Sequence, residues 1–228
     1  MKKKIIIIAV SVIVLAMTIA SATTAYFTDT DAVVNEFTVG NVDITLTETN
    51  TDYTGAAIEA VIENEETVYK FGRLYPGQTY TKLAVIENTG TENAYLAARI
   101  TLTSANLDAR FLENGAVKES AVRYFLQGLV SGDEYIVTFD AVENEANKII
   151  IRVIKKTATT IPTAEGVKEG FTLVNNVYVD PAWGNTEMAD LANLSIKVEA
   201  YGVQTVGFTS AEEAVTTAFK TDFPSANN

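Results

Sequence analysis

The sequence predicts an all-β protein, an antiparallel β-sandwich or jelly roll that follows an N-terminal export signal. Apolar and polar residues alternate with a period of two in many short segments, which is typical of strands with one buried face. Clusters of turn-forming residues separate these segments. Helical spacing appears in only two places. Seven or more strands joined by turns, with little helix, are the pattern of an antiparallel sandwich.

The N-terminus has the pattern of an export signal. Three lysines precede an apolar run from Ile5 to about Ala20, and the small residues of 21–25 follow. A basic start, an apolar middle and a small-residue end predict that residues 1–25 form a cleaved signal peptide, cut next to Ala25 or Tyr26. The apolar run approaches the roughly 17–20 residues that a spanning helix needs, so an uncleaved membrane anchor is the alternative.

The remaining chain is expected to form an extended segment over residues 26–40 and a single sandwich domain over 41–228. Val42, Ile44 and Leu46 alternate with polar residues and predict a half-buried first strand. Three further elements are expected in this half of the domain: a strand at 60–62, a Leu-Tyr-Pro-Gly turn at 74–77 and a central strand at 83–86, which is apolar on both faces.

The strongest strand pairing is expected around the Asn-Thr-Gly sequence at 88–90. This turn lies between the apolar strand at 83–86 and the apolar segment 95–102. A short turn between two such segments is typical of a β-hairpin. We therefore expect residues 95–102 to return beside residues 83–86.

The second half of the domain contains both predicted helices. Apolar residues recur near helical spacing from Val117 to Leu129, which fits one inserted helix and equally a strand over Val122–Leu129. Ser210 and Glu213 form a capping box ahead of a short amphipathic helix over about 211–220, which is expected to cover an open end of the sheet. The strands expected here are a hairpin of 135–139 with 149–154, and strands at 171–179 and 194–201.

Composition excludes several classes of function. The sequence has 17 Lys+Arg and 29 Asp+Glu, and removal of the lysines at positions 2–4 leaves 14 − 29 = −15. This charge opposes binding to nucleic acid. The chain has neither histidine nor cysteine, so the histidine-based zinc sites, the Ser-His-Asp triad and the Cys-His pair are all excluded. An exported chain without disulfides must be stabilised by its core, by bound ions or by neighbours.

Acidic clusters and the single tryptophan are the remaining candidates for a site. Paired carboxylates can hydrolyse glycosides when a cleft holds them at the right separation. The clusters here, Glu63, Glu65 and Glu66 and the pair Asp29 and Asp31, are better explained as solvated acidic surface. No EF-hand pattern is present, so we predict no catalytic residue, no metal site and no cofactor. Trp183 is expected to cover the core, with a ligand-stacking platform as the alternative.

Four patches resemble the TasA/camelysin family. They are listed in chain order: 25–29 with 35–40 (Ala-Tyr-Phe-Thr-Asp and Asn-Glu-Phe-Thr-Val-Gly), 74–77 with 85–90 and 94–96, 171–173 with 177–179, and 196–204 (Ile-Lys-Val-Glu-Ala-Tyr-Gly-Val-Gln) with 207–208 and the capping box. The resemblance spans nearly the whole chain and is weakest over 107–156.

This resemblance implies an exported surface or biofilm-matrix protein of a Gram-positive bacterium, cut by a dedicated SipW-type signal peptidase. It also implies a jelly-roll fibre subunit whose freed N-terminal segment completes the sheet of the next subunit, as in donor-strand complementation. The name camelysin implies a metallo-endopeptidase, but this chain lacks the histidines of a zinc protease, and we therefore expect no enzyme activity.

The N-terminal segment has the pattern of a donor strand. Phe27, Val33, Phe37 and Val39 lie at odd positions and can share one face, although Asp29, Asp31 and Asn35 interrupt it. An added strand satisfies the unpaired backbone groups of a sheet edge, and head-to-tail addition gives filaments. We expect a secreted structural subunit that assembles with copies of itself and with other matrix components. The alternatives are a monomeric immunoglobulin-like binding or adhesion module, in which this segment pairs with its own domain, and a camelysin-like peptidase.

Overall fold

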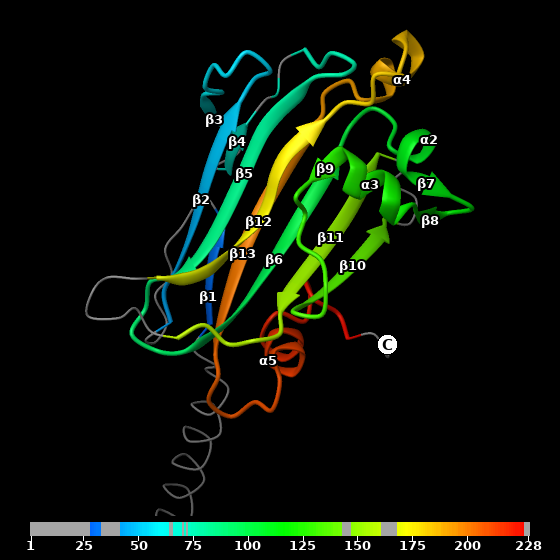
Figure 1. The fold of residues 1–228 in the computed structure, drawn as a ribbon. Helices are drawn as coiled ribbons and strands as arrows, with labels where there is room; N and C mark the ends of the chain where they lie inside the picture. Colours follow the sequence, from blue (N-terminus) through cyan, green and yellow to red (C-terminus); the bar gives the residue numbers. More distant parts are fainter. Residues whose placement is uncertain are drawn as a thin grey trace, which may run out of the picture.

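The computed structural model describes residues 28–32, 42–63, 66–69, 71, 73–142, 147–160 and 168–225. Two antiparallel sheets pack face to face, which confirms the predicted β-sandwich (Figure 1). The five-stranded sheet has the order β1 (Thr28–Ala32), β13 (Ser195–Gln204), β6 (Ala94–Thr103), β11 (Lys148–Lys155) and β10 (Tyr135–Ala141). The four-stranded sheet has the order β2 (Ile44–Thr51), β5 (Thr79–Asn88), β12 (Glu169–Tyr178) and β9 (Leu126–Gln127).

Smaller elements lie around the sandwich. Two short hairpins and four short helices are described: β3 (Ala60–Glu63) with β4 (Glu66–Tyr69), β7 (Leu112–Glu113) with β8 (Ala116–Val117), and α2 (Asp108–Phe111), α3 (Glu119–Phe125), α4 (Asn185–Asp190) and α5 (Ala211–Ala218). The middle segment thus contains the expected helix as α3, but that helix ends at Phe125. Only Leu126 and Gln127 adopt the strand that was its alternative.

The core lies between the two sheets because alternate residues of each strand point inward. On β5 the buried positions are the even-numbered ones from Tyr80 to Asn88, because successive side chains of a strand point to opposite faces. On β6, Leu96, Ile100 and Leu102 are completely buried in the same inter-sheet core. The predicted hairpin of the second half is confirmed, since β10 pairs with β11.

The predicted hairpin of β5 with β6 is wrong. β5 is central in the four-stranded sheet, between β2 and β12, whereas β6 lies in the five-stranded sheet between β13 and β11. The connection at 89–93 is therefore an arch between the sheets. Buried Asn88 stabilises it: the Asn88 amide donates to the Glu92 carbonyl at 2.9 Å and accepts from the Gly90 N–H at 3.0 Å. Both apolar strands can then bury their inner faces against each other across the core.

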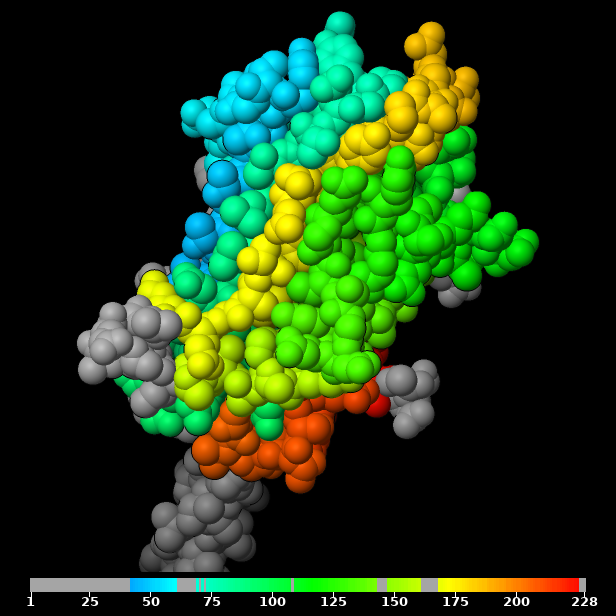
Figure 2. Space-filling model, viewed as in Figure 1, coloured from blue at the N-terminus to red at the C-terminus, as the bar shows by residue number. Residues whose placement is uncertain are grey.

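The C-terminal helix α5 packs on the outer face of the five-stranded sheet. Ala214 and Val215 lie in one cluster with Tyr201 and Val203 of β13. In Figures 1 and 2 the segment around α5 closes the lower end of the molecule. The capping prediction is confirmed at Ser210, whose hydroxyl accepts from the Glu213 N–H at 3.2 Å.

Candidate functional site

Strand β13 presents the edge of the five-stranded sheet to the N-terminal segment. β1 pairs antiparallel with β13, from Thr28 opposite Val203 to Ala32 opposite Glu199. On its other side, β13 pairs with β6 over all ten of its residues. Figure 1 shows β1 beside β13 at the edge of the sheet. β1 is thus a five-residue edge strand seated on a longer, firmly paired strand.

The inner face of β13 fits closely against the start of β2. Gly202 has no side chain, and a Cβ atom placed there would lie 2.6 Å from Cγ2 of Ile44 and 3.1 Å from Cγ1 of Val42. These distances are too short for any larger residue without a shift of β2. Ala200 and Val198 continue the same buried face. The two sheets therefore approach each other closely at the edge that receives β1.

The outer face of β13 is fixed by an ionic network. Arg99 of β6 donates through Nε to Glu199 Oε2 at 2.7 Å and also forms an ion pair with Asp222, beyond α5. Lys197 Nζ lies 3.1 Å from the other oxygen of Glu199. Tyr201 lies buried beneath α5, and this burial raises the pKa of its hydroxyl above its usual range. These groups have structural partners and attach the C-terminal segment to the sheet.

The residues that the sequence predicts for cleavage and assembly lie outside the described residues. They are Ala25, Tyr26, Phe27, Val33, Phe37 and Val39. Of the predicted segment 26–40, the structure describes the backbone of β1, including the positions of Asp29 and Asp31 opposite Gly202 and Ala200. The predictions about these side chains therefore remain predictions.

Among the residues that the structure describes, no group of three or more acidic side chains is arranged to hold a metal ion. The side chains of the two acidic clusters predicted from the sequence lie outside this description. Glu63 and Glu66 lie opposite each other at the turn of the β3–β4 hairpin, and Glu65 lies outside the described residues. Trp183 packs against Phe111 and Phe125, each with a ring-centroid distance of 6.2 Å, and so covers the core.

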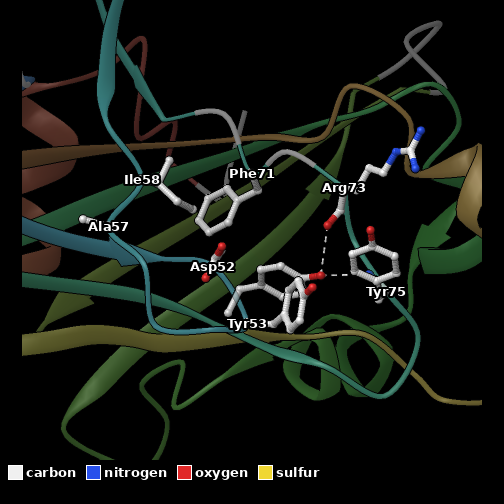
Figure 3. A pocket seen from close by; sticks show the side chains of 8 residues that line it. Asp52, Tyr53, Ala57, Ile58, Phe71, Arg73 and Tyr75 are labelled. Atoms are coloured by element: carbon white, nitrogen blue, oxygen red, sulfur yellow. Dashed lines mark hydrogen bonds between the residues drawn. The ribbon is translucent and has the colours of Figure 1, made fainter.

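An aromatic pocket lies near the end of β2 (Figure 3). Its volume is about 360 Å³, and its lining residues are Asp52, Tyr53, Ala57, Ile58, Phe71, Arg73, Tyr75 and Tyr80. The rings of Tyr53 and Tyr75 meet edge to face at 5.2 Å, and both side chains are more than 40% exposed. The buried Tyr80 hydroxyl accepts from the Tyr75 N–H at 2.8 Å and donates to the Arg73 carbonyl at 3.1 Å. The pocket could not be predicted from the sequence, because its residues come from three separate segments.

A buried polar group inside the sandwich was also missed. Lys82 of β5 is fully buried and forms an ion pair with Glu48 of β2. The Lys82 Nζ lies 5.3 Å from the centre of the Tyr69 ring. Burial lowers the pKa of Lys82, while Glu48 acts in the opposite direction. Asn50 is buried beside this pair, 4% exposed, and neither of its amide atoms has a hydrogen-bond partner among the described residues.

No helix in the part of the chain that the structure describes is long and apolar enough to cross a membrane. Comparisons with protein-family models, with curated proteins and with solved structures find no match. The function must therefore be argued from the residues themselves, and the edge of β13 is the candidate site that the N-terminal segment reaches.

Proposed function

We propose that this chain is a secreted structural subunit of the extracellular or biofilm matrix or of the cell surface. Subunits assemble head to tail when the N-terminal segment of one chain adds to the β13 edge of the next. The observation that carries this proposal is the pairing of β1 with β13, in which the segment directly after the predicted signal peptide occupies a sheet edge. The resemblance to the TasA/camelysin family supports the same function.

The backbone contacts of β1 can be made within one chain or between two chains. In the single chain, Thr28–Ala32 occupies its own β13 edge. Each strand-to-strand hydrogen bond contributes about 0.5–1.5 kcal/mol net, so a five-residue strand is held only modestly. A neighbour's segment offers the same backbone groups and can replace it, as in domain swapping. Head-to-tail replacement does not close on itself and therefore gives a filament.

The register of the pair defines the face of β13 that each position of the segment meets. Directly opposite residues of an antiparallel pair lie on the same face of the sheet. A strand seated in this register therefore places its odd-numbered positions on the face of Gly202 and Ala200, which are on the inner side of β13. In β1 these odd-numbered positions are Asp29 and Asp31, which interrupt the apolar alternation of Phe27, Val33, Phe37 and Val39 in the sequence.

Export and charge complete the proposal. Cleavage next to Ala25 by a dedicated signal peptidase frees the donor segment, and the net charge of −15 after removal of three lysines keeps chains apart until a specific contact forms. The partners are other copies of this chain and other matrix components, with no role for nucleic acid. No enzyme activity is proposed, since the histidine-free sequence does not support the camelysin-like peptidase.

The alternative function is that of a monomeric immunoglobulin-like module that binds a surface ligand. Two observations favour it. β1 pairs with its own chain, and the pocket of about 360 Å³ presents the exposed rings of Tyr53 and Tyr75. The concentration dependence of the molar mass of the mature protein, measured by light scattering, separates the two functions. Growth of the mass with concentration supports the fibre subunit, and a constant monomer mass supports the binding module.

Deletion of residues 26–39 tests the donor segment directly. We expect the truncated chain to remain soluble and to form no filaments in electron micrographs, because the donor strand is missing. Phe37→Asp should reduce the filament yield strongly, because it places an unpaired carboxylate in an apolar contact. A peptide with the sequence of 26–39 should bind the truncated chain and block growth of the wild type. Circular dichroism serves as the folding control, and normal filaments from the truncated chain would rule out donation.

A further inference from the structure

A lysine and an asparagine lie at directly opposite positions of two neighbouring strands inside the sandwich. β2 and β5 are neighbouring antiparallel strands, and Asn50 lies directly opposite Lys82. Directly opposite side chains share one face and have Cβ atoms about 4.5–5.5 Å apart. Lys82 is completely buried and Asn50 is 4% exposed, so both functional groups are confined to one space that excludes water.

Glu48 completes this group of three residues. It lies two positions before Asn50 on β2 and therefore on the same face. Its carboxylate contacts the Lys82 ammonium directly, and the Tyr69 ring lies close to the same nitrogen. A buried ion pair loses the hydration of both charges, and transfer of the proton from Lys82 to Glu48 removes both charges at once. The transfer leaves a neutral amine, which is the nucleophilic form.

No hydrogen bond among the described residues accounts for the buried side-chain amide of Asn50. Neither its Nδ2 nor its Oδ1 has a hydrogen-bond partner among the described residues. A buried carboxamide without partners destabilises a fold, and buried polar groups of this kind are rare. Asn88, the other buried asparagine described, uses its amide to fix the arch between the sheets. The side-chain amide of Asn88 thus has hydrogen-bond partners, whereas that of Asn50 has none among the described residues. Asn50 lies opposite Lys82, whose neutral amine is a nucleophile.

We propose that Lys82 and Asn50 become joined by an intramolecular isopeptide bond, with Glu48 as the proton carrier. The neutral Lys82 amine attacks Cγ of Asn50 and forms the Nζ–Cγ bond. One Nζ proton passes through the Glu48 carboxyl group to Nδ2 of Asn50. The Cγ–Nδ2 bond then breaks and ammonia leaves. An amine and a primary amide thus give a secondary amide and ammonia, with no oxidation or reduction.

The product fits the site better than the starting groups. The bond replaces a buried ammonium and a carboxamide that has no partner among the described residues by one neutral amide. It also links β2 to β5 covalently and closes the segment between them, which contains the β3–β4 hairpin. In a chain without cysteine, this link supplies the kind of constraint that a disulfide gives to other exported proteins.

The intact mass of the full-length chain tests the proposal. The chain is first allowed to fold, and its mass is then measured under denaturing conditions. We expect a mass below the calculated value by one molecule of ammonia, and a proteolytic fragment in which the peptide of Lys82 is linked to the peptide of Asn50. Glu48→Gln and Asn50→Ala should restore the calculated mass and abolish the linked fragment. Asn50→Asp should lose water in place of ammonia. Because the bond forms within one chain, these results do not depend on filament formation.

A matched control excludes another source of ammonia. Asn114 precedes Gly115, and an Asn-Gly sequence can lose ammonia by cyclising on its own backbone. Asn114→Asp should therefore leave the ammonia deficit and the linked fragment unchanged. If a variant does not fold, the intact mass and the linked fragment of the wild type are enough to decide the proposal. Full calculated mass in the folded wild type, or a deficit that disappears in Asn114→Asp, would overturn the proposal.

Discussion

Gly202 shows how a single residue shapes the candidate assembly edge. The absent side chain lets Ile44 and Val42 approach the backbone of β13, and an added Cβ would meet Ile44 at 2.6 Å. We predict that Gly202→Val destabilises the protein by about 1–3 kcal/mol, because the added groups force β2 away from β13. Urea unfolding followed by circular dichroism measures this change.

Thr49→Val is the control for Gly202→Val, because it introduces valine at an exposed position of β2. Its free energy of unfolding should lie within about 0.5 kcal/mol of the wild-type value. Equal stability of Gly202→Val and the wild type would contradict the close packing at this edge.

The buried polar residues could not be predicted from the sequence. Glu48 and Asn50 continue the alternation of Val42, Ile44 and Leu46 but break its polarity, and taken alone they suggest the end of a buried strand. Their partner Lys82 is 34 residues from Glu48, and only the pairing of β2 with β5 brings them together. The pocket has the same origin, since Tyr53 and Tyr75 meet only in the folded chain.

At the scale of elements, the sequence predicts strands better than their partners. The hydrophobic pattern of a strand depends on which of its faces are buried, and this pattern located β2, β5, β6, β10, β11, β12 and β13. It carries no information on the sheet that a strand joins. The five residues between β5 and β6 suited a hairpin as well as an arch, and Asn88 with its two hydrogen bonds supports the arch.

The start of α5 depends on the charge of one carboxylate. Glu213 accepts hydrogen bonds from the N–H of Thr209 at 2.9 Å and from its hydroxyl at 2.6 Å. These bonds lower the pKa of Glu213 below its ordinary value of 4.5. Because the folded pKa is depressed, the contribution to stability is present above pH 4.5 and is lost as the pH falls through the folded pKa.

We predict from this sign that Glu213→Gln lowers the stability of α5 at neutral pH and reduces its further loss below pH 4.5. Amide hydrogen exchange in α5 checks the prediction, with one measurement at neutral pH and one in the acidic range. Glu212 is the matched control, because it is an acidic residue in the same first turn of α5. An equal effect of Glu212→Gln and Glu213→Gln would show that the two bonds to Thr209 have no special role.

At the scale of the whole molecule, the proposed fibre uses one edge of the sandwich. The class of fold was predictable, because strands separated by turns with little helix leave few other arrangements. The origin of the strand on the β13 edge could not be predicted. The same backbone hydrogen bonds satisfy the edge whether the donor strand comes from the same chain or from its neighbour. A measurement must therefore distinguish the origin of the donor strand.

Cysteine cross-linking between two labelled populations makes this distinction. Asp31 lies opposite Ala200, and directly opposite residues have the Cα separation that a disulfide requires. The natural chain contains no cysteine, so a disulfide between an Asp31→Cys chain and an Ala200→Cys chain must join two molecules. A mixture of Asp31→Cys with Val203→Cys is the control, because position 203 pairs with Thr28.

We predict that the Asp31→Cys and Ala200→Cys chains, secreted, mixed and assembled, form a disulfide-linked heterodimer within the filaments, identified by the mass of the joined peptides. The control mixture should give little of this product. A double variant that carries both cysteines in one chain measures how much of the pairing occurs within a single chain. If the mixture yields no heterodimer while the double variant closes its disulfide entirely within single chains, β1 belongs to its own domain and the donated-strand fibre is contradicted.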